Sequence, residues 1–233
     1  MSPGSQPSSG GSWESNRASP RQSTQVIVDR TRIAIEAIPR ATVRFMRVVA
    51  GSARGRRLIA PPGTNVRPTS DRVREAIFNA LGSLDAVDDR VVLDLFAGTG
   101  ALGIEALSRG ARQVVFVEKD PAARAAIETN LQTTGLGDRA RLVRGDALHF
   151  VRDGSRRFDL VLLDPPYRFE HWATLLNDLA GAVTPDAIVL LESDRELMLA
   201  EGWRVERQKR YGSTFVAIAR PPESLRPSQP ESR

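Results

Sequence analysis

Short apolar runs alternate with longer amphipathic segments along the chain from about residue 90 onward. The short runs predict buried strands, and segments with apolar residues three and four apart predict helices. Strands are expected near residues 91–95, 113–118, 140–144, 158–163 and 187–192, and helices near residues 101–109, 121–133, 146–152 and 169–182. This alternation predicts right-handed βαβ units, and therefore an α/β fold with a mostly parallel sheet between two layers of helices.

The last part of the pattern differs from its middle. Residues 203–210 and 214–219 are two strand-like runs joined by Tyr211-Gly212-Ser213. Two such runs with a short glycine-containing connection predict an antiparallel hairpin, here at an edge of the sheet. Together with the five expected parallel strands, this hairpin gives a seven-stranded sheet.

Residues 46–60 predict a smaller hairpin, because two strand-like runs, 46–50 and 56–60, flank a turn that contains glycine. After the break at Pro61-Pro62-Gly63, Thr69 or Ser70 is expected to cap a helix that runs to about Leu81. The apolar face of that helix is expected to consist of Val73, Ala76, Ile77, Ala80 and Leu81, with Arg72, Arg74 and Glu75 off it.

Composition divides the chain into four parts. Ser, Gly, Pro and Gln dominate the beginning, so residues 1–45 are expected to form a disordered N-terminal extension. Residues 46–83 form the basic hairpin and helix, residues 84–221 the catalytic domain, and residues 222–233 a polar tail. Met46 opens the compact pattern so clearly that it could be the natural start, which leaves the role of the preceding residues open.

The composition also excludes several kinds of chemistry. The chain has no cysteine, which excludes disulfides and thiolate catalysis, and its two histidines are too few for a typical imidazole-rich metal site. No apolar run approaches the roughly 20 residues that a transmembrane helix needs. We therefore expect a cytoplasmic protein with no metal and no membrane partner. A mostly parallel core with one basic face suits a monomer and leaves a dimer open.

Positive charge is concentrated near the start of the compact region. Eight arginines and one acid, Asp71, lie between residues 44 and 74, so this segment carries +7 and the remainder −2 of the net +5. Such a concentration is typical of proteins with polyanionic partners, because phosphate contacts supply much of their affinity. The alternative is a solvated basic face. The candidate RNA-binding residues are Arg47, Arg54, Arg56, Arg57, Arg67 and Arg72.

A glycine-rich loop follows the first expected strand of the sheet. Gly98-Thr99-Gly100-Ala101-Leu102-Gly103 fits G-x-G-x-x-G, and Glu118 lies 20 residues beyond Gly98 at the end of the next strand. This pattern alone is compatible with a dinucleotide site. However, Asp94 and further acids at later strand ends favour a cationic ligand. S-adenosylmethionine carries a sulfonium and an amino group without a pyrophosphate and suits this set, whereas the alternative is a tight turn without a ligand.

The predicted cofactor site combines the ends of three strands. Asp146 follows the third strand and could accept a hydrogen bond from an adenine amino group, because the carboxyl ends of parallel strands open onto one crevice. Its alternative role is the N-cap of the next helix, and the two roles can coexist. The candidate cofactor-binding residues are Asp94, Phe96, Gly98, Gly100, Glu118, Asp146 and Ala147.

The tetrapeptide Asp164-Pro165-Pro166-Tyr167 directly follows the apolar run at 158–163. Prolines fix φ and remove donors, so the Asp164 side chain and the Pro165 carbonyl can each accept a hydrogen bond from an exocyclic amine. Tyr167 or Phe169 could then stack on a base that has left its helix or loop. Asp164, Pro165 and Tyr167 are the candidate catalytic residues for methyl transfer to a nucleobase; the alternative is an ordinary Pro-Pro turn. No role is assigned to His149, His171 or Trp172.

With these motifs the chain resembles the RsmD family of bacterial 16S ribosomal RNA guanine-N2 methyltransferases. The resemblance covers about residues 46–220 and includes the runs 46–51 and 67–79, the loop after Asp94, the tetrapeptide and Tyr211-Gly212. Many amino-methyltransferases share the middle motifs, whereas the two N-terminal runs are specific. The first 45 residues have no counterpart in that pattern.

The resemblance implies a class I, Rossmann-like methyltransferase that uses S-adenosylmethionine to methylate the exocyclic N2 of one guanine in the 16S ribosomal RNA of the small ribosomal subunit. It implies that Gly98, Gly100, Glu118 and Asp146 bind the cofactor, and that Asp164 and Tyr167 hold the guanine. The residues by themselves indicate only amine methylation and an RNA-like partner. Guanine, N2 and the ribosome come from the resemblance alone.

Other functions stay open at this point. An adenine-N6 methyltransferase acting on DNA or RNA could use the same tetrapeptide, although the chain has little room for a large target-recognition domain. A catalytically inactive RNA-binding factor in ribosome assembly could keep this fold, but the intact Gly98, Asp146 and Asp164 argue against it. A nicotinamide dehydrogenase is a more distant interpretation of the glycine loop.

Overall fold

The computed structural model describes residues 46–60, 70–154 and 156–225. The expected disordered extension before residue 46, Arg67 with the possible cap Thr69, and most of the expected polar tail lie outside the described residues. Within the described part of the chain, no helix has the length and apolar character needed to cross a membrane.

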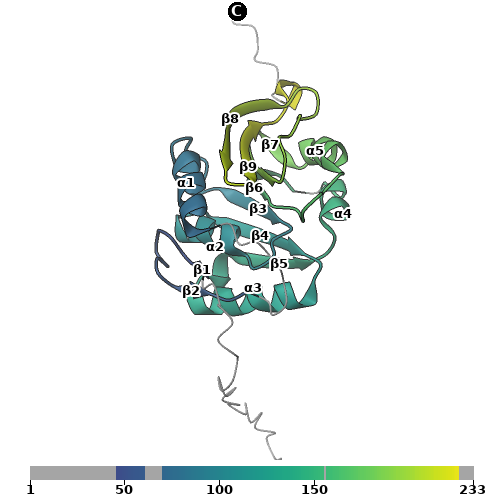
Figure 1. The fold of residues 1–233 in the computed structure, drawn as a ribbon. Coiled ribbons are helices and arrows are strands. Elements are labelled where there is room, and N and C mark those ends of the chain that lie inside the picture. The colour runs from purple at the N-terminus through teal and green to yellow at the C-terminus, as the bar shows by residue number, and fades with distance from the viewer. Residues whose placement is uncertain (1–45, 61–69, 155, 226–233) are drawn as a thin grey trace, which may run out of the picture. The chain divides into compact units, whose positions relative to one another are not determined.

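A seven-stranded sheet with the strand order β5-β4-β3-β6-β7-β9-β8 forms the centre of the fold (Figure 1). The pairs from β5 to β7 are parallel, and β9 runs antiparallel to both β7 and β8. The predicted mostly parallel sheet with a C-terminal hairpin is therefore confirmed. The strands are β3 (Val91–Leu95), β4 (Gln113–Glu118), β5 (Ala140–Arg144), β6 (Phe158–Leu163), β7 (Val183–Ser193), β8 (Arg204–Tyr211) and β9 (Thr214–Arg220).

Helices cover both faces of the sheet, as the alternation predicts (Figure 1). One face carries α1 (Asp71–Gly82), α2 (Ala101–Ser108) and α3 (Pro121–Thr134), and the other carries α4 (Ala147–Arg152) and α5 (Trp172–Ala180). Successive strand residues point to the two cores in turn. In β3, Val92 packs with the first layer of helices, whereas Leu93 and Leu95 pack with the second. Two short 3-10 helices complete the described elements at Gly137–Arg139 and Glu223–Leu225.

The strand order reverses between β3 and β6. From β3 the chain builds the sheet outward to β5, and then returns to place β6 on the other side of β3. In open α/β sheets, ligands bind outside the carboxyl ends of the strands at such a reversal. The glycine loop after β3 and the tetrapeptide after β6 both lie at this edge.

The N-terminal hairpin forms, but its strands are shorter than expected. β1 (Met46–Arg47) and β2 (Arg57–Leu58) pair antiparallel over two residues each. The residues that follow β1 bind α2 instead, because the buried carboxylate of Glu105 accepts hydrogen bonds from the amides of Val49 at 2.7 Å and Ala50 at 3.0 Å. A side chain of α2 therefore takes the donors that a longer strand would use.

Arg74 lies on the buried face of α1, so the expectation that it lies off that face is wrong. The buried residues of this helix are Arg74, Ile77, Phe78 and Leu81, while Val73, Ala76 and Ala80 are only partly buried. The guanidinium of Arg74 lies 2.9 Å from Asp71 Oδ1 and 3.7 Å from Glu105, and it donates to the Arg47 carbonyl. Arg74 thus forms buried ion pairs that link α1 to Glu105 of α2, and it adds nothing to the exposed basic surface.

Gly51 allows the turn between β1 and β2 to touch the backbone of α2. Ser52 N donates to the Ser108 carbonyl at 2.8 Å, and Ala53 N donates to the Ser108 hydroxyl at 3.0 Å. Between these contacts and β1, Gly51 has a left-handed backbone with φ of +83°, and a Cβ there would lie 1.8 Å from the Ser108 carbonyl oxygen. Only glycine fits this close approach.

Gly51→Ala is expected to destabilise the fold more than Gly55→Ala. Both glycines have a left-handed backbone, with φ of +83° and +82°, so each substitution should cost about 1–2 kcal/mol in strain. A Cβ at Gly55 meets nothing within 4 Å, whereas the clash at Gly51 should remove a further 1–3 kcal/mol or so from the free energy of unfolding. Urea denaturation of both variants measures the difference, and equal losses would contradict the contact with α2.

Candidate active site

Three acidic side chains meet at the carboxyl ends of three adjacent strands. Asp94 belongs to β3, Glu118 ends β4, and Asp164 follows β6. Leu95 is paired with Val117 of β4 and with Leu163 of β6. Glu118 and Asp164 are the next residues after these two partners, so they flank the end of β3. The structure thus brings together the acids that the sequence predicts for a cation site.

Asp94 and Glu118 hold the glycine loop by its backbone. Asp94 is buried and its Oδ2 accepts from Gly103 N at 2.9 Å, and Glu118 Oε2 accepts from Gly98 N at 2.8 Å. The other oxygen of Glu118 accepts from Asp120 N at 2.8 Å. Gly103 has to be glycine, because a Cβ there would lie 2.3 Å from the Phe116 ring. The two acids therefore fix the loop that faces the strand ends.

The site concentrates carboxyl groups whose ionisation is unfavourable. Burial raises the pKa of Asp94 well above its ordinary value; the hydrogen bond from Gly103 opposes this shift, while the charges of Asp164 and Glu118 add to it. Burial also raises the pKa of Asp164, to about 6. Because the carboxyl groups repel one another, a cation placed among them would be bound favourably.

Asp146 caps α4, which is the alternative role that the sequence left open. Its Oδ1 accepts from Leu148 N at 3.0 Å, and its Oδ2 lies 3.6 Å from Lys119 Nζ. The end of β5 lies beside β4, because Gly145 N donates to the Glu118 carbonyl at 3.3 Å. Asp146 therefore lies at the same edge as the other acids, and its contact with an adenine stays a prediction, as does that of the buried Ala147.

The tetrapeptide after β6 forms a tight turn that presents Tyr167 to solvent. Phe169 N donates to the Pro166 carbonyl at 3.1 Å, and Arg168 has a left-handed backbone with φ of 63°. Tyr167 is 75% exposed. Asp164 and Pro165 are partly buried behind it. Of the two aromatic residues considered for stacking on a base, Tyr167 is the accessible one.

Phe169 instead packs in an aromatic cluster beside the turn. Its ring centroid lies 5.3 Å from that of Phe96, 5.9 Å from that of His171 and 5.3 Å from that of Trp172, all in edge-to-face geometry. Phe96, which the sequence places in the cofactor set, thus connects the glycine loop to the tetrapeptide. His171 and Trp172 have a supporting role here that the sequence did not predict.

Two residues after β7 also hold the turn and were missed from the sequence. Asp194 Oδ2 accepts from Arg168 N at 3.2 Å, and Arg195 donates to the Phe169 carbonyl at 2.9 Å. Asp194 directly follows β7, and an acid at the end of a predicted strand is the sequence feature that could have identified it. A third missed residue is the buried Asn130, which donates to the carbonyls of Thr99 at 2.9 Å and Ile59 at 3.0 Å.

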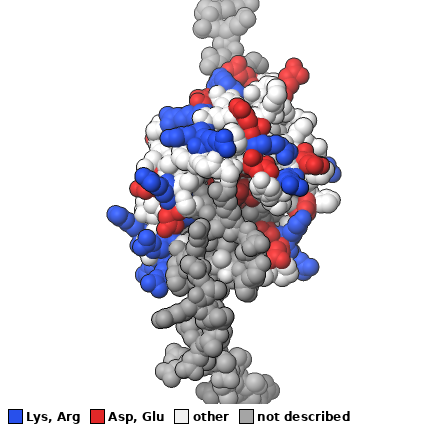
Figure 2. All heavy atoms as spheres, in the orientation of Figure 1, with Lys and Arg blue, Asp and Glu red and all other residues white. Residues whose placement is uncertain are grey.

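The candidate RNA-binding arginines that the structure describes are exposed: Arg47, Arg54, Arg56, Arg57 and Arg72. Figure 2 shows basic side chains over the region where β1 and β2 lie in Figure 1. The turn that contains Arg54 is bound to Ser108, the last residue of α2, whereas α2 begins beside the glycine loop. This basic surface therefore extends along α2 away from the strand ends.

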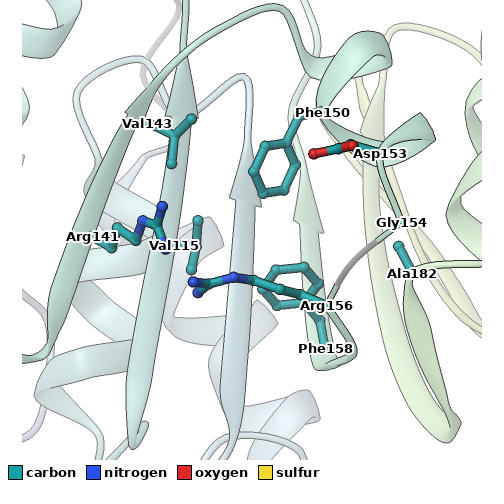
Figure 3. Close-up of a pocket in the computed structure, with 9 residues that line it drawn as sticks. All are labelled: Val115, Arg141, Val143, Phe150, Asp153, Gly154, Arg156, Phe158 and Ala182. Carbon is teal, nitrogen blue, oxygen red and sulfur yellow. The ribbon is translucent and has the colours of Figure 1, made fainter.

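A recess of about 220 Å³ lies apart from the acids, on the face of the sheet covered by α4 (Figure 3). It lies beside α4, where Val115 of β4 and Arg141 and Val143 of β5 face Phe150. Neither Asp94 nor Asp164 lines this recess. Its lining residues are Val115, Arg141, Val143, Phe150, Asp153, Gly154, Arg156, Phe158 and Ala182. Among the described residues, no group of three or more His, Asp or Glu side chains is placed to hold a metal ion.

Comparison with known proteins places the chain in a family. A family model described as conserved hypothetical protein 95 matches residues 46–220. YlbH of Bacillus subtilis is 41% identical over 181 residues, 74% of this chain and 97% of that protein. Ribosomal RNA small subunit methyltransferase D of Escherichia coli is 38% identical over 179 residues, 74% of this chain and 88% of that protein. The solved structure of yhhF from Escherichia coli has a TM-score of 0.69 and 34% identity, covering 76% of this chain and 98% of that one.

The matched region is the span over which the motifs predict the resemblance. It begins at Met46, the first residue of β1, and ends at Arg220, the last residue of β9. It thus contains the N-terminal hairpin, the glycine loop and the tetrapeptide in one match. The chain belongs to the RsmD family.

Proposed function

We propose that this protein transfers the methyl group of S-adenosylmethionine to the exocyclic N2 of a guanine in the 16S ribosomal RNA of the small ribosomal subunit. The observation that carries the proposal is the convergence of Asp94, Glu118 and Asp164 at the ends of adjacent strands, beside an exposed Tyr167. The name of the Escherichia coli relative, ribosomal RNA small subunit methyltransferase D, supports the RNA substrate. We expect the protein to act in the cytoplasm as a monomer.

The residues at the strand ends fit the cofactor. Bound there, S-adenosylmethionine would supply an electrophilic methyl group on a positively charged sulfur. Burial raises the pKa of Asp94 and the neighbouring acids raise it further, and a cation would relieve the repulsion among these acids. Gly98 and Gly100 keep the backbone open for close approach, and Glu118, which holds the loop, retains lone pairs for ribose hydroxyls.

Asp164 and Pro165 would hold the target amine. Their side-chain and backbone oxygens can each accept one hydrogen bond from the amino group, which turns the nitrogen lone pair toward the methyl group. Tyr167 would stack on the base after it leaves its helix or loop. In the proposed transfer, the nitrogen would bond to the methyl carbon as the carbon–sulfur bond breaks with its electron pair on sulfur, leaving S-adenosylhomocysteine, and the methylated amine would lose a proton to water or to Asp164. Catalysis therefore rests mainly on positioning and electrostatics rather than on a strong base.

Methyl transfer to purified small subunits that lack this modification tests the proposal, with naked 16S ribosomal RNA and DNA as parallel substrates. Labelled S-adenosylmethionine is the donor, and nucleosides are separated after digestion. N2-methylguanosine is the expected product. Label in N6-methyladenosine would replace this function by the adenine alternative, and cofactor binding without transfer to any substrate would indicate an inactive RNA-binding factor.

Asp164→Ala is expected to lower kcat by about 10²–10³-fold, because it removes one of the two acceptors that orient the amine. The affinity for S-adenosylmethionine should stay within a few-fold, since the glycine loop is held by Asp94 and Glu118. Steady-state kinetics and calorimetric titration measure the two quantities. Asp153→Ala, at an exposed acid that follows α4, is the matched control and should behave as wild type. Normal turnover by Asp164→Ala would refute its role.

The pH dependence should report the ionisation of Asp164. Since burial raises its pKa to about 6, kcat/KM should fall as the pH decreases through 6 and be about tenfold below its plateau at pH 5. The midpoint for kcat should lie lower, because the bound cation favours the carboxylate. A flat kcat/KM profile between pH 5 and pH 7 would contradict this assignment.

The raised pKa of Asp164 also affects the stability of the fold. A carboxylate in an ion pair stabilises the fold when it ionises, whereas ionised Asp164 should destabilise it. A pKa raised above the ordinary value of 3.8 means that the ionised Asp164 destabilises the fold above pH 6, and that this penalty vanishes below about pH 4. Asp164→Asn should therefore raise Tm at pH 8 and leave it unchanged near pH 4. An unchanged Tm at pH 8 would mean that the carboxyl is not desolvated.

A further inference from the structure

β8 is an exposed strand at the outer edge of the sheet. Every residue from Arg204 to Arg210 is exposed, and four of these seven residues are basic against one acid, Glu206. Figure 2 shows Lys and Arg side chains gathered over the part of the molecule where β8 lies in Figure 1. The sequence pattern marks this strand only as half of a hairpin, and the catalytic function does not use it.

The charges of β8 fall into two groups. In its first half, Arg204 lies 3.3 Å from Glu206 and 3.1 Å from Glu223, and Arg220 of β9 lies 2.9 Å from Glu206. In its second half, Arg207, Lys209 and Arg210 form no ion pair with any carboxylate in the described ranges. The second group therefore has its charge available for an anionic partner.

Aromatic rings hold two of these cations in place. Lys209 Nζ lies 5.2 Å from the centre of the Tyr211 ring, and the Arg210 guanidinium lies 5.1 Å from that of Phe215. Arg210 also donates to the Gly212 carbonyl at 2.8 Å, which ties it to the turn after β8. Basic residues interleaved with aromatic rings are typical of surfaces that bind single-stranded RNA.

The strand register places this group at the same edge as the active site. Leu163 of β6 is paired with Leu191 of β7, Ser193 with Phe215 of β9, and Phe215 with Arg210. Ser193 lies two residues beyond Leu191, just as Pro165 lies two residues beyond Leu163, so Arg210 is level with Pro165. Three strand spacings of about 4.8 Å separate them, which is about 14 Å.

We propose that the end of β8, with Arg207 and Lys209 on one face of this edge strand and Arg210 on the other, is a second RNA-contacting surface that holds the RNA backbone on one side of the target nucleotide. The turn of the basic hairpin lies beside Ser108 at the end of α2, away from the strand ends, whereas the end of β8 is level with the tetrapeptide, so the two surfaces would contact different parts of the RNA. The partner is RNA because the surface combines unpaired cations with aromatic rings level with the tetrapeptide. This inference rests on the proposed function.

The test is the salt dependence of binding of the full chain to unmodified 16S ribosomal RNA, measured by filter retention. Arg207→Gln with Lys209→Gln removes two charges and leaves Arg210, which ties the turn, in place. Each phosphate contact contributes about 0.7–0.9 to the log-log slope, so the slope should fall by about 1.4–1.8 and binding at 0.15 M salt by about 15- to 30-fold. Arg207→Lys with Lys209→Arg keeps both charges and should restore most of the slope.

The matched control removes two charges elsewhere. Arg141 and Arg156 line the recess under α4, are exposed and form no ion pair in the described part of the chain, so Arg141→Gln with Arg156→Gln should leave the slope unchanged (Figure 3). Equal losses in the two double variants would show a general effect of net charge and overturn the proposal. An unchanged slope for the β8 variant would do the same.

Two further readouts separate this proposal from its alternatives. In methyl transfer, the β8 variant should raise KM with kcat and Tm unchanged, whereas loss of kcat with a normal slope would contradict an RNA-binding role. Sedimentation should give the same mass for wild type and variant; a dimer that only the wild type forms would assign β8 to contact with a second copy of this chain. If the wild type methylates no RNA nucleoside, the proposed function fails independently of the slope.

Discussion

The reversal of strand order between β3 and β6 is the constraint on which the rest of the site depends. It places the ends of β4, β3 and β6 side by side, so acids that are 24 to 70 residues apart in the sequence face one crevice. Burial raises the pKa of Asp94, and the charges of Asp164 and Glu118 raise it further. The structure tolerates this because Asp94 and Glu118 accept hydrogen bonds from amides of the glycine loop. Carboxyl groups beside a preformed glycine loop suit a small cationic cofactor.

The N-terminal hairpin is coupled to this loop through buried polar side chains rather than through strand pairing. Glu105 accepts from two amides of the extension and lies 3.7 Å from Arg74 of α1. Asn130 binds both Ile59 at the end of the hairpin and Thr99 in the glycine loop. Because unpaired buried polar groups are costly, these contacts fix the hairpin relative to α2 and α3. The hairpin that carries the basic surface is therefore bound to α2 and α3.

Local sequence patterns predict the sheet well and the extension less well. The strands β3 to β6 begin and end at the expected residues, since each is a short apolar run bounded by polar or glycine-containing turns. β7 starts four residues before the expected strand. The prediction began too late because Thr184, Pro185 and Asp186 do not resemble a buried strand, and the pairing of β6 with β7 is irregular after Phe158. The burial of Arg74 depends on Glu105, which is 31 residues away, so no local pattern in α1 could show it.

The candidate site shows the same division. Strand-end acids, glycines and the tetrapeptide are visible in the sequence because each directly follows an apolar run. The residues that hold these loops in place, Asp194, Arg195 and Asn130, are not visible in the sequence, because they act through contacts between distant segments. The aromatic cluster around Phe169 also needs the fold to bring Phe96 beside it. Binding of the cofactor by Asp146 and Ala147 and of RNA by the exposed arginines stays a prediction.

Calorimetric titration with S-adenosylmethionine and S-adenosylhomocysteine at pH 6, in buffers of different ionisation enthalpy, tests most directly whether the strand ends form a cation site. If the sulfonium is held beside Asp94 and Asp164, its charge lowers the pKa of both acids. A few-fold coupling to Asp164 corresponds to a shift of about half a unit from its pKa of about 6, so S-adenosylmethionine should release about a quarter of a proton from Asp164. S-adenosylhomocysteine, which lacks this charge, should release fewer protons. Equal proton release by the two ligands, or binding of a nicotinamide dinucleotide in place of both, would contradict the account.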